Sequence, residues 1–89
     1  MRVVVIWRDN EDYSRSVIEF LRDIEHRLGK APESLSPDSP EGESLARSYD
    51  IVEYPSILAI NDDGKLVQLW RGIMLPKIDD VSFYLLEDH

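Results

Sequence analysis

The residues most open to a chemical role form the stretch Glu11-Asp12-Tyr13-Ser14. We expect Tyr13 and Ser14 at the start of a helix, where free backbone N–H groups and the helix dipole favour a negatively charged ligand. The same position suits an ordinary N-terminal cap, which is the simpler interpretation of Ser14. The stretch therefore allows both anion binding and helix capping.

The chain contains no cysteine. Disulfide bonds, thiolate nucleophiles and cysteine-based metal sites are therefore excluded. His26 is expected on the surface near a helix end and His89 is the last residue, so neither is a predicted ligand. Asn61, Asp62 and Asp63 could be taken for part of a calcium loop, but the later ligands are missing and a turn explains them better. We predict no metal and no cofactor.

Length and charge narrow the class of protein. The 89 residues are enough for one small domain, spanning 1–89. The net charge is -8 and the basic residues never cluster, so we expect no nucleic-acid partner. The apolar run Arg2–Trp7 has only the length of a strand, and no segment approaches the roughly 20 residues of a membrane span. We therefore predict a cytoplasmic protein without a membrane span or a signal peptide.

The first half of the chain predicts a strand, a helix and a short strand. Arg2–Trp7 is a continuous β-branched run, typical of a central strand covered on both faces. A helix then runs to about Leu28, and Gly29 ends it. A short strand near Glu33–Ser36 is expected at a sheet edge, where proline is tolerated. The helix should bury an apolar stripe made of Val17, Leu21, Ile24 and Leu28, widened by Ile18 and Phe20.

The second half predicts a helix, a hairpin and a last helix. Ser39-Pro40-Glu41 is a helix start, and that helix ends near Tyr49. Strands Ser56–Ile60 and Leu66–Arg71 are joined by a turn with an Asp-Gly signal. Pro76 opens the last helix. The order predicts an α/β fold, a mixed sheet with helices on both faces.

This order, with a proline before the third strand, resembles the thioredoxin fold. The segment YDIVEYPSILAINDDGKLV, Tyr49–Val67, is similar to the thioredoxin segment that carries the cis-proline and the hairpin. The resemblance implies a four-stranded sheet with strand order 2-1-3-4. It also implies that the Tyr54-Pro55 bond is cis.

The resemblance also shows what this chain lacks. In thioredoxins a Trp ends the first strand and the redox CxxC motif follows; here the Trp is Trp7, and the two cysteine positions are Glu11 and Ser14. The buried acid that precedes the Trp in the family is replaced by Val5. Because disulfide exchange needs a thiolate, we expect no thiol–disulfide oxidoreductase activity and no catalytic residues.

The thioredoxin resemblance implies a shallow groove where the first helix, the cis-proline loop and the turn after the last strand meet. The backbone before the proline can pair there with an extended peptide, as an added strand does. Glu11 and Glu53 would favour basic or neutral segments. We therefore expect a redox-inactive protein- or peptide-binding module. Its candidate groove holds Trp7, Glu11, Tyr13, Ser14, Glu53, Tyr54, Pro55, Gly72 and Ile73.

A second possibility is a small thiol- or glutathione-binding enzyme. Glutathione transferases place a Tyr or Ser in this region to stabilise a bound thiolate, which here would be Tyr13 or Ser14. Their acidic-Ser pair, which holds the glutathione amine, normally follows the last strand. Here that place holds Gly72-Ile73-Met74.

Overall fold

The computed structural model describes residues 1–86. Its helices and strands, in chain order, are β1 (Arg2–Ile6), α1 (Ser14–Leu28), β2 (Glu33–Leu35), α2 (Pro40–Ser48), β3 (Ser56–Ile60), β4 (Leu66–Arg71) and α3 (Ile78–Leu85).

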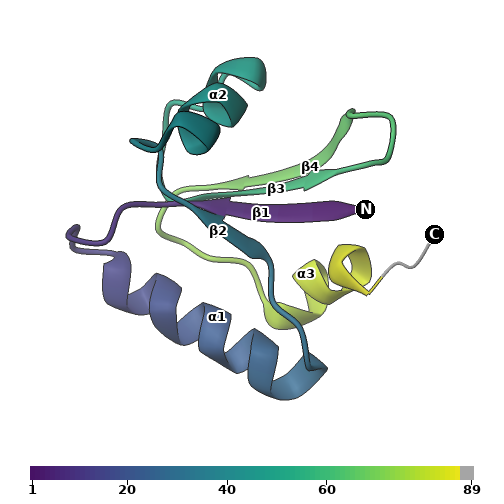
Figure 1. Cartoon of the computed structure of the whole chain (residues 1–89). Coiled ribbons are helices and arrows are strands. Elements are labelled where there is room, and N and C mark those ends of the chain that lie inside the picture. The colour runs from purple at the N-terminus through teal and green to yellow at the C-terminus, as the bar shows by residue number, and fades with distance from the viewer. Residues whose placement is uncertain (87–89) are drawn as a thin grey trace.

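The strands form one mixed sheet with the order β2-β1-β3-β4 (Figure 1), which confirms the predicted order. β1 pairs parallel with β2 and antiparallel with β3, and β3 pairs antiparallel with β4. The apolar run at the N-terminus is therefore a central strand, whereas β2 and β4 are the two edges.

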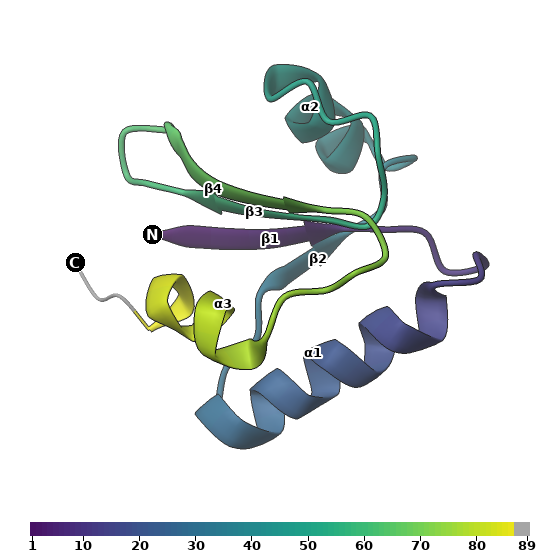
Figure 2. The same ribbon diagram turned by 180° about the vertical axis from the view of Figure 1, so that it is seen from behind.

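The helices cover both faces of this sheet, α1 and α3 on one and α2 on the other (Figures 1 and 2). Since successive side chains of a strand point to opposite faces, β1 contributes to both cores. Val3 and Val5 pack in a cluster with α1 and α3, and Val4 and Ile6 pack in a cluster with α2. Continuous apolarity in β1 thus serves two cores at once.

Local signals fix several element ends where they were expected. The Ser39 hydroxyl accepts a hydrogen bond of 3.0 Å from the Gly42 N–H, and Pro40 is the first residue of α2. Gly29 ends α1 in the left-handed conformation, at φ 75°. Asn61 Oδ1 accepts hydrogen bonds from the N–H groups of Asp63 and Lys65, which closes the β3–β4 hairpin.

Two expectations about the helices were wrong. Ile18 does not widen the buried stripe of α1, because its side chain is 43% exposed. The stripe follows Val17 and Ile24, and one residue step turns a helix by about 100°, which carries Ile18 to the solvent side. The last helix begins at Ile78 instead of Pro76, since Lys77 before it is extended, with ψ 151°.

No helix within residues 1–86 has the length and apolarity to cross a membrane. The cytoplasmic location stays a prediction.

Candidate functional site at the cis-proline end

The predicted cis-proline loop and the turn after β4 lie against each other. The Tyr54-Pro55 peptide bond is cis, the isomer that the resemblance implies. The buried Pro55 accepts a hydrogen bond of 2.9 Å on its carbonyl oxygen from the Gly72 N–H. Gly72 has φ 91°, and a Cβ there would lie 2.8 Å from Glu53 Oε2. Glu53, Pro55 and Gly72 therefore lie next to one another.

Arg8 connects this loop to the start of α1. Its Cζ lies 5.2 Å from the centroid of the Tyr54 ring. Its N–H donates a hydrogen bond of 2.9 Å to the Tyr13 hydroxyl, and its carbonyl accepts one of 2.7 Å from the Ser14 hydroxyl. The structure thus brings the end of β1 and the start of α1, which are neighbours in sequence, together with the distant loop before β3.

The Ser14 hydroxyl has both hydrogen-bonding roles filled. It accepts from the Glu11 N–H at 2.9 Å while it donates its proton to the Arg8 carbonyl, and Ser14 is only 6% exposed. Ser14 is the first residue of α1, and Tyr13, which precedes it, makes no side-chain cap. Ser14 therefore closes the loop between Arg8 and α1, instead of capping the helix in the ordinary way.

The side chains of the candidate groove differ in their access to solvent. Glu11, Asp12, Glu53 and Ile73 are exposed, and Ser14 and Pro55 are buried. Trp7, Tyr13, Tyr54 and Gly72 are half-buried. Trp7 and Tyr13 pack against the α1–α3 core, whereas Tyr54 packs against the α2 core. The aromatic residues thus have part of their surface in the cores and part outside.

The charges at this end fall into a paired and an unpaired group. Arg8 holds Asp38 through two hydrogen bonds, of 3.0 Å from Nε and 3.1 Å from Nη2. Because these bonds favour the carboxylate, the pKa of Asp38 is lowered, and the same bonds raise the pKa of Arg8. Glu11 and Glu53 form no ion pair with any of the residues 1–86.

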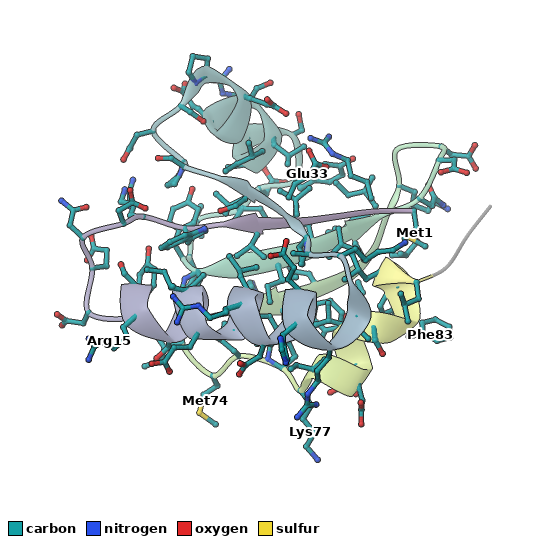
Figure 3. All side chains as sticks on the ribbon, turned by 60° about the horizontal axis from the view of Figure 1, so that its bottom comes forward. Met1, Arg15, Glu33, Met74, Lys77 and Phe83 are labelled. Carbon is teal, nitrogen blue, oxygen red and sulfur yellow. The ribbon has the colours of Figure 1, made fainter. Side chains whose placement is uncertain are left out.

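The backbone of Tyr54 is unpaired within the described part of the chain, because neither its N–H nor its carbonyl takes part in a hydrogen bond. Two exposed apolar residues belong to the adjoining segments. Val52, which precedes Tyr54 in the same loop, is 86% exposed, and Ile73, which follows Gly72, is 70% exposed. Met74 follows Ile73 and projects away from the body of the molecule (Figure 3).

Sequence reasoning missed Arg8, Asp38 and Val52 at this end. The position of Arg8, directly after Trp7 and so at the end of a central strand, was a signal for it. Asp38 had none, because it lies in the irregular segment before α2. No group of three or more potential metal-ligating side chains occurs in residues 1–86.

No protein-family model matches the chain, and no curated protein sequence matches it. A solved structure, thioredoxin 1 from the thermophilic eubacterium Thermosipho africanus, is similar to it with a TM-score of 0.63 and 13% sequence identity. The match covers 97% of this chain and 91% of that thioredoxin. Together with the strand order, the likeness shows that this cysteine-free chain has the thioredoxin-like fold and lacks the CxxC motif.

Proposed function

We propose that this domain binds an extended segment of a partner protein at its cis-proline end and has no redox activity. The observation that carries the proposal is the backbone of Tyr54, whose N–H and carbonyl have no partner within residues 1–86. An extended chain can satisfy both groups as an added strand does. The exposed Val52 and Ile73 would supply apolar contacts on either side.

The charges at this end set the kind of segment that fits. Glu11 and Glu53 are exposed carboxylates without an ion pair among the described residues, and Arg8 is already paired with Asp38. The overall charge is -8. The partner segment is therefore basic or neutral, since like charges across an interface are costly.

The test is a selection of peptides from a random displayed library, followed by NMR titration of the selected peptides. The Tyr54 and Gly72 amide signals should shift most. Ile73→Ser should weaken binding about tenfold or more, which is the effect of losing one well-packed apolar contact. Val67→Ser is the matched control, because Val67 is an exposed apolar residue on β4 outside the candidate groove.

A second arm tests the charge preference. Glu53→Gln should shift the selection from basic towards neutral peptides, whereas Glu19→Gln, an exposed acid on α1, should leave it unchanged. Selected peptides that shift amides elsewhere, or that bind Ile73→Ser as tightly as the unchanged protein, would rule out this site.

A second candidate, a thiol-binding enzyme, rests on Tyr13 alone. The Ser14 proton is donated to the Arg8 carbonyl, so it is not free for a thiolate. The Tyr13 hydroxyl accepts from the Arg8 N–H and keeps its own proton to donate. Glutathione titration would support this candidate if the Tyr13 and Pro55 signals shifted and Tyr13→Phe abolished the shift. Unshifted spectra at millimolar glutathione would remove it.

A further inference from the structure

A recess lies between the edge strand β4 and the helix α3. It has a volume of about 430 Å³ and is open to solvent. Its lining consists of Gln68, Trp70, Asp79, Asp80, Phe83 and Tyr84. None of these residues belongs to the candidate groove.

Three aromatic rings make up one part of the recess. The Tyr84 ring stands edge-to-face to Trp70, with centroids 5.6 Å apart, and edge-to-face to Phe83, with centroids 4.9 Å apart. Phe83 is 69% exposed and lies at the surface of α3 (Figure 3). The face of an aromatic ring carries partial negative charge and attracts cations.

Two carboxylates make up the other part. Asp79 lies one helical turn before Phe83, and Asp80 one turn before Tyr84, so each carboxylate is on the same side of α3 as one of the rings. Both side chains are exposed, and within residues 1–86 neither forms an ion pair. The Oε1 of Gln68 already accepts from the Leu69 N–H, and the two carboxylates are the charged groups of the lining.

The combination of aromatic rings and carboxylates favours one kind of cation over others. A methylated ammonium group would use the rings but offers few or no N–H donors to the two carboxylates. A lysine ammonium would satisfy a carboxylate but is strongly hydrated and a weaker match for the rings. A guanidinium uses both, because it is planar, stacks on aromatic faces and donates in a fork to carboxylates.

We propose that this recess binds an arginine side chain of a partner protein, with the guanidinium stacked on the aromatic rings and hydrogen-bonded to Asp79 and Asp80. Its lining shares no residue with the candidate groove. It lies on an edge strand, where a partner can approach without displacing any part of this fold.

The two tryptophans make the test selective. Trp70 lines the recess and Trp7 belongs to the candidate groove, so their indole N–H signals in a proton–nitrogen NMR spectrum report the two places separately. The probe is a capped Gly-Arg-Gly peptide. We expect it to shift the Trp70 indole signal and to leave the Trp7 signal in place. The same peptide with citrulline, which is neutral and almost the same shape, should bind about tenfold more weakly or worse.

The variants test each part of the recess. Asp79→Asn with Asp80→Asn should weaken the arginine peptide at least about tenfold. Asp23→Asn with Glu25→Gln removes the same charge from the exposed side of α1 and should change affinity less than about twofold. Phe83→Ala, an exposed position, provides a variant that removes a ring without opening the core.

Several results would overturn the proposal. They are tighter binding of a trimethyllysine peptide than of the arginine peptide, equal binding of the citrulline peptide, and equal weakening by the control pair on α1. A shift of the Trp7 signal alone would also overturn it, because the arginine would then occupy the candidate groove. If a peptide selected at the candidate groove does not shift the Trp70 indole signal, its binding tests the proposed function and not this site.

Discussion

The guanidinium of Arg8 lies over the ring of Tyr54 while it forms a two-point ion pair with Asp38. Arg8 thereby ties the residue before the cis-proline to the segment that precedes α2. Both ends of the ion pair are accessible to water, so the pair acts mainly by orienting Arg8. Exposed pairs add little to stability and are screened by salt.

The Arg8–Asp38 pair predicts a pH-dependent effect of Asp38→Asn. The pKa of Asp38 is lowered in the folded state, so its contribution is present above its unfolded pKa and is lost as the pH falls through the folded pKa. We expect Asp38→Asn to be slightly less stable at about pH 7 in low salt, and this difference to disappear as the pH falls through the folded pKa. Urea unfolding over a series of pH values measures this. Asp12→Asn, an exposed acid without an ion pair in the described structure, should show no such difference.

Ser14→Ala should destabilise the protein. The hydroxyl joins the Glu11 N–H to the Arg8 carbonyl, and its removal leaves both groups to find water. We expect a loss of about 1 kcal/mol in the free energy of unfolding, measured by denaturant titration. Ser16→Ala is the matched control, since Ser16 is exposed in the same helix and makes no side-chain hydrogen bond within residues 1–86. Equal stability of the two variants would mean that the Ser14 bonds contribute nothing.

Glu11→Cys with Ser14→Cys should form a disulfide inside the chain. The Glu11 nitrogen and Ser14 Oγ are 2.9 Å apart, so the two positions lie on adjoining sides of one turn. Oxidation should remove the two free thiols, as measured by thiol titration and mass spectrometry. The unchanged protein should not reduce insulin above background, because it has no thiol to attack a disulfide. Two cysteines that stay reduced in air would show that this turn differs from the geometry described.

Gly42→Ala should destabilise α2 more than its conservative nature suggests. A Cβ at Gly42 would lie 1.8 Å from the backbone oxygen of Ser36, and a backbone cannot yield as a side chain can. We expect a loss of about 2–3 kcal/mol in the free energy of unfolding, as for other overpacked sites. Ser44→Ala, exposed in the same helix, should change it by no more than about 0.5 kcal/mol. A thermal melt of each variant distinguishes the two outcomes.

Much of the fold could be predicted because its signals are local. The β-branched run in β1, the Ser39-Pro40 helix start and the Asp63-Gly64 turn each fix a strand or a helix end within a few residues. The strand order then came from the resemblance, and the sheet agrees with it.

The misses are contacts between segments far apart in sequence. Nothing near Arg8 in the sequence predicts that Asp38 will hold its guanidinium. The place of Trp70 beside Tyr84 depends on where α3 crosses β4. The exposure of Ile18 likewise depends on how α1 is rotated against the sheet, which a stripe of apolar residues defines only to within one position.

The two faces of β1 are nearly interchangeable. Val3 and Val5 occupy one core, and Val4 and Ile6 the other. If β1 shifted by one residue, each face of the strand would present almost the same apolar side chains, so these side chains alone hardly define the correct register. The residues at the two ends of β1 must define it. Arg2 is held at one end by Glu33 and Glu41, and the Trp7 indole N–H donates to the Ser34 hydroxyl at the other. The polar contacts at the two ends of β1, more than its apolar side chains, therefore determine the register of the strand.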